Sequence, residues 1–246
     1  MSLVVLFIRA LTLPFLLLLA VTSVVSQQSD ECPCSWRDDN RSWRCEVPGE
    51  AVPTQCWQIH EDVRIIQFLV PFPIGSHDLN HENLLNVERL EINYVTSIAH
   101  DALRSLTKVT YLDIMKSNIT RLPDLSSQTL VSSLDASHSN LVDAPSLAHL
   151  THLALVSLHH NYIERLADDF LPNADGTVGM SMVHNSLTEM NASSIVQAPP
   201  LSSFTFDQLE VVWATQQEKD TLVAKNFYCN IDLLSIVKII DDPTNP

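Results

Sequence analysis

Three histidines recur along the chain at nearly constant spacing. His138, His160 and His184 lie 22 and 24 residues apart, and His159 stands beside the second of them. Imidazole changes its charge between pH 5 and 8, and neutral imidazole is a good ligand of transition metals. If a regular fold brings these rings together, they can bind a partner, respond to pH or hold a metal ion.

The apolar residues repeat with the same period. In VSLHHNYIERL (156–166), Val156 and Leu158 are two residues apart, which is typical of a strand, and the wider spacing after Asn161 indicates a turn. The arrangement recurs in steps of 22, 22, 22, 24 and 24 residues at Leu90/Ile92, Leu112/Ile114, Leu134/Ala136, Val156/Leu158, Met180/Met182 and Phe204/Phe206. Such self-similarity predicts a repeat architecture in which each unit buries its apolar residues against its neighbours.

The positions that follow each strand also repeat. The turn position holds Val95, Ser117, Ser139, Asn161, Asn185 and Leu209, and the next apolar position, from the second unit on, holds Ile119, Leu141, Ile163, Leu187 and Val211. A weaker unit precedes these in VRIIQFLV (63–70). In the first unit a reading shifted by two residues, with Asn93, Val95 and Ile98, fits equally well, because Val95 and Ser97 stand where Asn and Leu are expected.

This pattern resembles the leucine-rich repeat, L-x-x-L-x-L-x-x-N-x-L, over residues 63 to 213. The resemblance implies an α/β repeat solenoid, a horseshoe arc of about six to seven repeats over residues 61–225 with a parallel β-sheet on its concave face. The Asn and Ser side chains at the turns are then structural, because they can hydrogen-bond to backbone groups of adjacent turns.

A leucine-rich α/β domain is the alternative fold. It needs helices of about a dozen residues between its strands. The intervals contain residues that break such helices, namely Pro123, Pro145, Pro172, Pro199 and Pro200. We therefore expect irregular or one-turn segments on the convex side.

Residues 1–26 have the features of a signal peptide. An apolar run from Leu11 to Val25 follows Arg9, is short for a bilayer span, and ends at a plausible cleavage point after Ser26. An uncleaved anchor is the alternative. With cleavage, no later segment is long enough to span a membrane, and we expect a secreted, extracellular protein in an oxidising compartment, where disulfides persist.

Four of the five cysteines lie directly before the repeats, in residues 27–60. Cys32, Cys34, Cys45 and Cys56 allow three pairings by sequence alone. The segment resembles the N-terminal cysteine-rich cap of extracellular leucine-rich repeat proteins, which implies pairing of Cys32 with Cys45 and of Cys34 with Cys56. A zinc site is disfavoured by the spacing and the compartment.

Residues 226–246 resemble the opening of the family's C-terminal cap, in degenerate form. Phe227, Cys229, Asp232 and Leu233 are in place, but Ile231 occupies the position of the second cysteine. The apolar residues from 233 to 240 predict a short amphipathic helix that covers the last repeat. Cys229 is then unpaired: a buried thiol, the site of a disulfide to a partner or second copy, or the sign of a truncated gene product.

Composition agrees with export. The net charge of −15 and a pI near 4.8 disfavour nucleic acid and anionic membranes as partners. Asn40, Asn118 and Asn191 begin glycosylation sequons. Asn118 follows a strand directly, so we expect it to be partly hidden.

Two columns of side chains are expected to point outward from the concave face. Four residues after the first strand position stand Tyr94, Lys116, His138, His160, His184 and Gln208; three residues before these stand Glu91, Asp113, Asp135, Ser157, Ser181 and Thr205. The face is thus acidic at its N-terminal end and rich in histidine in the middle, where adjacent rungs are about 4.8 Å apart.

Three interpretations of the histidine column remain open: a solvated polar face, a partner-binding surface and a transition-metal site. No catalytic motif is present, so we expect no enzyme and no cofactor, with metal-assisted hydrolysis on the histidines as the one concrete catalytic form.

The sequence favours non-covalent binding of an extracellular protein or glycan. The expected contact residues are Tyr94, Lys116, His138, His159, His160 and His184, with Glu91, Asp113 and Asp135 setting the charge preference. The alternative is an accessory subunit of an extracellular assembly, joined through Cys229 and the apolar C-terminal segment.

Overall fold

The computed structural model describes residues 32–46, 49 and 51–240, which belong to one compact unit beginning at Cys32. The predicted signal peptide lies outside the described residues. Among the residues that are described, no helix combines the length and apolar character that crossing a membrane requires.

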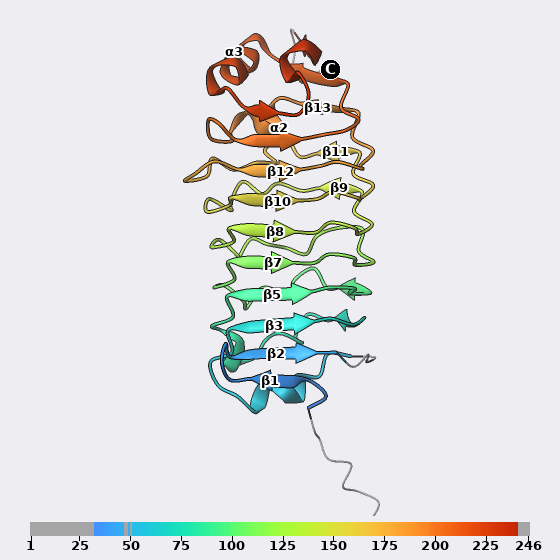
Figure 1. Ribbon diagram of the computed structural model, residues 1–246, viewed down its shortest axis with the longest axis vertical. Helices are drawn as coiled ribbons and strands as arrows, with labels where there is room; N and C mark the ends of the chain where they lie inside the picture. Colours follow the sequence, from blue (N-terminus) through green and yellow to red (C-terminus); the bar gives the residue numbers. More distant parts are fainter. Residues whose placement is uncertain (1–31, 47–48, 50, 241–246) are drawn as a thin grey trace, which may run out of the picture. The chain divides into compact units, whose positions relative to one another are not determined.

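A ten-stranded, mostly parallel sheet dominates the structure (Figure 1). Its strands, in spatial order, are β1 (Ser35–Arg37), β2 (Ser42–Cys45), β3 (Ile65–Phe68), β5 (Arg89–Ile92), β7 (Tyr111–Asp113), β8 (Ser133–Asp135), β10 (Leu155–Ser157), β12 (Gly179–Ser181), β14 (Ser203–Thr205) and β16 (Tyr228–Cys229). Only β1 and β2 pair antiparallel. The spatial order follows the chain order, so each strand is one rung of an open sheet.

The register of the sheet confirms the alignment read from the sequence. Leu90 pairs with Leu112 and Leu112 with Leu134, and the column continues through Val156, Met180 and Phe204. The weak early unit supplies β3, in which Ile66 pairs with Leu90. These residues are buried and form one continuous core with the second apolar column.

The segments that return the chain to the next rung are short, as the prolines predict. Their short strands form three small parallel sheets: β4 (Pro73–Ile74) with β6 (Ser97–Ile98), β9 (Asp143–Ala144) with β11 (Arg165–Leu166), and β13 (Glu189–Asn191) with β15 (Val211–Ala214) and β17 (Val237–Ile239). The connecting segments also contain the short helices η1 (Thr54–Gln58), η2 (Glu82–Leu84) and α2 (Ser193–Val196). The longest helix in the described part is α3 (Gln216–Lys225), which begins at a capping box of Thr215 and Glu218.

Buried amides connect the turns of successive rungs. The Asn161 amide donates to the carbonyls of Ala136 and Leu158, at 2.9 Å each, and its Oδ1 accepts from the N–H of Leu141 at 3.1 Å. Asn185 makes the same bonds one rung later, to Leu158, Met182 and the N–H of Ile163. Each side chain therefore satisfies buried backbone groups of its own rung and of the rung before it.

Two serines do the same work nearer the N-terminus. Ser117 Oγ accepts from the N–H of Val95 and donates to the carbonyl of Ile92, and Ser139 Oγ accepts from the N–H of Ser117 and donates to the carbonyl of Ile114. The prediction that these turn residues are structural is confirmed. Val95 takes the same buried place in the first unit, which favours the unshifted alignment there.

The disulfides correct the pairing that the family resemblance implies. Cys34 bonds to Cys45 and Cys32 bonds to Cys56. The reason is the hairpin of β1 and β2: Ser35 pairs with Arg44, so Cys34 and Cys45 face each other across the two strands, with their Cα atoms 4.3 Å apart. In this register Cys32 lies two residues beyond that pair and does not face Cys45.

The C-terminal segment differs from the predicted amphipathic helix. Up to residue 240, where the described part ends, the segment forms one 3-10 turn, η3 (Leu233–Ile236), followed by β17, which pairs parallel with β15. Val237 and Ile239 are β-branched and extend a sheet that already exists, which outweighs the helical pattern. Cys229 takes the inward position next to Phe204 and is a half-buried free thiol, whose pKa burial raises.

Replacing Asn161 by Ala is expected to lower the free energy of unfolding by roughly 2–4 kcal/mol, because three buried backbone groups lose their partner. Urea unfolding followed by circular dichroism measures this change. Asn173→Ala, at an exposed position, is the matched control and should change it by less than about 0.5 kcal/mol. Equal effects of the two substitutions would mean that the ladder does not stabilise the fold.

Candidate functional site

The predicted outer column lies in the turns that follow the strands. Tyr94, Lys116, His138, His160 and His184 all have left-handed backbone, with φ between 55° and 66°. This conformation reverses the chain so that the next residue, the buried ladder residue, enters the core. Gln208, the sixth predicted member, does not share it. Sequence analysis therefore found the column but mistook its backbone for strand.

Left-handed backbone is unfavourable for residues with a Cβ, at a cost of about 1–2 kcal/mol each. Glycine avoids this cost, yet the chain has only four glycines and places none of them here. Five successive rungs thus keep a residue with a side chain at a position where the backbone conformation favours glycine.

The rings of the column stack on one another. The His138 and His160 centroids are 4.3 Å apart with an interplanar angle of 15°, and those of His160 and His184 are 4.2 Å apart with an angle of 29°. His159 stands edge-on to His138 and His160, at 5.1 and 5.4 Å. We call these four residues the histidine cluster.

Hydrogen bonds fix the two flanks of the histidine cluster. Nδ1 of His159 lies 2.8 Å from Oγ of Ser157, and Nδ1 of His184 lies 3.3 Å from a carboxylate oxygen of Asp207. The same Asp207 oxygen accepts the backbone N–H of His184 at 2.6 Å. Asp207 was not predicted, because it stands one residue before the column position in its own rung.

The environment of the histidine cluster disfavours the charged forms of His159 and His160. Burial lowers the pKa of His159, with His138 and His184 adding to the effect and Asp135 opposing it. The pKa of His160 is also lowered, first by desolvation and then by the three neighbouring imidazoles, while Asp207 opposes the shift. Both rings therefore take up protons below the ordinary range of imidazole.

The acidic column is mostly engaged inside the protein. Glu91 forms an ion pair with Arg89 and accepts a 2.7 Å hydrogen bond from Gln67, and the Arg89 guanidinium lies 3.8 Å from the centroid of the Tyr111 ring. Asp113 accepts the N–H of Met115 at 3.0 Å. Asp135 accepts the N–H of Ser137 at 2.9 Å in the same way.

Burial, aided by the charges of Asp135 and Glu91, raises the pKa of Asp113 to about 6, although the Met115 N–H and Arg89 oppose the shift. Asp113 is only 6% exposed. Its role near neutral pH is therefore to hold the strand end, and contact with a partner falls to residues that reach solvent.

Two exposed residues extend the column toward the N-terminus. The Lys116 ammonium lies 5.6 Å from the centroid of the Tyr94 ring and 3.5 Å from its hydroxyl. This is a cation–π contact at the surface. Lys116 and Tyr94 thus continue the row as a fixed positive charge followed by an aromatic ring.

An open depression of about 370 Å³ runs beside the stacked rings. Its lining includes His138, His160 and His184 together with Asn140 and Tyr162, and Tyr162 is 60% exposed. Sequence analysis missed Asn140 and Tyr162. The signal for both was their place two residues after the column, on the same edge of the sheet.

The ring geometry gives the metal-site interpretation no support. Lone pairs of imidazole lie in the ring plane, so stacked rings direct them side by side and not toward a common point. In the described part of the chain, Cys32, Cys34 and Cys56 are the one group of three residues with ligand atoms close enough for a metal, and these sulfurs are in disulfides.

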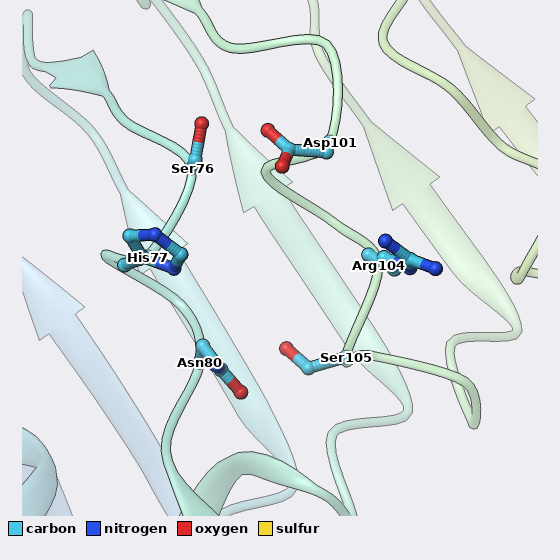
Figure 2. A pocket seen from close by; sticks show the side chains of 6 residues that line it. All are labelled: Ser76, His77, Asn80, Asp101, Arg104 and Ser105. Atoms are coloured by element: carbon cyan, nitrogen blue, oxygen red, sulfur yellow. The ribbon is translucent and has the colours of Figure 1, made fainter.

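A second polar pocket, of about 280 Å³, lies on the return segments (Figure 2). Ser76 hydrogen-bonds to Asp101 and lowers the pKa of its carboxyl, with His77 and His100 adding to the effect. The Ser105 hydroxyl donates to the carbonyl of Leu79 at 2.9 Å. Serine, histidine and aspartate meet here, but the aspartate bonds to the serine and not to the histidine, so the trio lacks the order of a proton relay.

All three sequon asparagines are exposed. The expectation that Asn118 is partly hidden is wrong, because the residue follows the left-handed turn and faces solvent. Its Oδ1 accepts a 2.7 Å hydrogen bond from Asn140, which lines the depression beside the histidine cluster. A sugar on Asn118 would therefore border that depression.

No family model matches the chain, and no curated protein matches it. Function is therefore inferred from the site itself.

Lys116→Gly is expected to give a more stable protein than Lys116→Ala, by about 1 kcal/mol, because glycine relieves the left-handed backbone. Chemical denaturation of both variants measures the difference. At Glu164, an exposed position whose φ is not positive, the order should reverse. Alanine as the more stable residue at position 116 would contradict the assignment of strain.

Asp113→Asn is expected to stabilise the protein by roughly 2–3 kcal/mol above pH 6. The pKa of Asp113 is about 6 in the folded protein against an ordinary value of 3.8, so its charged form is disfavoured by folding. The gain should shrink as the pH falls through 6 and vanish below about pH 4, where the carboxyl is protonated in both states. Urea unfolding across this range tests the profile, with exposed Asp169→Asn as control; a gain that persists at pH 3.5 would refute the cause.

Proposed function

We propose that the chain is a secreted leucine-rich repeat protein that binds another protein through the outer edge of its parallel sheet. The repeat pattern, the rungs in register and the hydrogen-bonded turn ladder support this fold. The N-terminal hairpin with two disulfides supports an oxidising compartment. The apolar N-terminal segment and three exposed sequons support export.

The observation that carries the proposal is the row of left-handed residues with side chains. Strained backbone of this kind persists where the side chain has a use, and here it recurs on five successive rungs. The side chains point away from the core in one row, in which the three histidines stack and Lys116 lies over the ring of Tyr94. Solenoids use such extended surfaces for recognition, and imidazole and phenol rings supply both contact area and hydrogen bonds.

The contact surface then consists of the exposed members of the predicted set and the half-buried His159 beside them. The exposed members are Tyr94, Lys116, His138, His160 and His184. Glu91 and Asp113 are buried and already bonded, so they hold the strands and shape the local charge. Asp135 is intermediate in exposure and bonded to its own turn.

The second candidate is an accessory subunit joined through the last rung. Cys229 lies on β16, which ends the ten-stranded sheet, and Tyr228 and Leu234 are exposed beside it. An open sheet edge with apolar side chains can pair with another chain. Burial raises the pKa of the thiol, which slows its reaction at neutral pH and makes this candidate the weaker one. Intact mass with and without reductant separates a covalent assembly from a free binder.

Replacing His138, His160 and His184 together by Ala is expected to weaken partner binding at least tenfold, because the stacked strip loses its contact area. A photo-crosslinking residue at position 159 identifies the partner, and titration of the purified partner measures affinity. Arg121→Ala with Arg165→Ala, whose side chains are 79% and 81% exposed near β9 and β11, is the matched control and should leave affinity unchanged. Loss of binding in the control alone would move the interface to the return segments.

A further inference from the structure

We propose that the histidine cluster is a proton-gated site for an acidic protein segment, which it captures on acidification and releases near neutral pH. This inference rests on the proposed function, because it assigns both a partner chemistry and a control to the same surface. It is carried by the spacing of the four rings and by the charges around them.

The first step is the crowding of the rings. Four imidazoles lie with neighbouring centroids 4.2 to 5.4 Å apart, and His160 has a ring against each face. Protonation of one ring therefore places a positive charge next to its neighbours, which opposes further protonation. An anion beside the stack offsets this repulsion, so anion binding and proton uptake must favour each other.

The second step is that the protein supplies only part of the counter-charge. Asp207 lies against His184, and Asp135 acts on His159. Lys116, one rung before His138, has the same sign as a protonated imidazole. In the described residues no carboxylate forms an ion pair with His138 or His160. These two rings form the unbalanced centre of the cluster, and both line the open depression.

The third step is the change of sign across the whole face. With neutral imidazoles, the fixed charges there are two cations and four carboxylates: Arg89, Lys116, Glu91, Asp113, Asp135 and Asp207. Acidification to about pH 5 neutralises Asp113, whose pKa is about 6, and charges imidazoles. The fixed charges are then two cations and three carboxylates, so the edge of the sheet becomes net positive once two imidazoles are protonated, while the acids that remain are bonded inside the protein.

The surroundings of the cluster distinguish two kinds of anion, a long polyanion and an acidic protein segment. A sulfated polysaccharide lying along the face would cross Glu91 and Asp135 as well as the histidines, and the chain as a whole carries a net charge of −15. A protein segment can place a few carboxylates beside the cluster without lying against Glu91 and Asp135. Beside the cluster, Tyr162 and Tyr94 are 60% and 43% exposed and offer apolar contact for the rest of the segment. The geometry thus favours an acidic peptide over a long polyanion.

Fluorescence anisotropy with a labelled hexaglutamate peptide tests the inference on the full secreted protein at pH 7.5, 6.5 and 5.5. Glutamate stays largely ionised at pH 5.5, so changes in affinity report on the protein. We expect binding at least tenfold tighter at pH 5.5 than at pH 7.5, since each proton taken up on binding contributes up to about tenfold per pH unit. Hexaglutamine should not bind at any pH.

The double variant His138→Asn with His160→Asn is expected to lose this pH dependence, because asparagine tolerates left-handed backbone but does not titrate. His77→Asn with His152→Asn, at exposed histidines outside the cluster, is the matched control and should keep it. Circular dichroism at each pH shows that both variants are folded.

Affinity that is independent of pH, or a pH dependence retained by the double variant, would overturn the proton gate. A heparin oligosaccharide that binds more tightly than the peptide at pH 5.5 would overturn the choice of a protein ligand. The proposed function is tested separately: if the triple alanine variant still loses its partner at neutral pH, partner binding stands without the gate.

Discussion

The structure depends on how each turn satisfies buried backbone groups between two rungs. A left-handed residue reverses the chain, and the side chain that follows it, Asn161 or Asn185 in the clearest cases, enters the core and bonds to the turn before it. Because these bonds join rung to rung, they fix both the register of the sheet and the spacing of the turns. The surface column exists because this arrangement is repeated.

The same constraint explains why the histidines stack. Residues in one position of successive rungs are held a strand spacing apart, and this spacing alone brings planar side chains face to face. The backbone alone would favour glycine at these positions. A protein that keeps Tyr94, Lys116 and three histidines there gives up some stability for a continuous surface, and it buries Glu91 and Asp113 behind that surface to hold the strands.

The period of the sequence predicted much of this fold. It located the strand register, both apolar columns and the structural role of Ser117 and Asn161, because side-chain burial follows spacing directly. Features that depend on local backbone or on chain pairing were not predictable in this way. The left-handed φ of His160 needs the turn geometry, the bond between Cys34 and Cys45 needs the hairpin register, and Val237 joins a sheet that the sequence gives no sign of. Asp207 and Tyr162 entered the site only through proximity across rungs.

The central claim is that the histidine cluster is the surface that meets a partner. Histidine modification by diethyl pyrocarbonate, read by mass spectrometry on the free protein and on its complex from native fluid, tests this most directly. The account predicts that His138, His159, His160 and His184 lose reactivity together in the complex, while His77 and His152 stay as reactive as in the free protein. If His77 or His152 lost reactivity in the complex while the four cluster histidines stayed reactive, this claim would be contradicted.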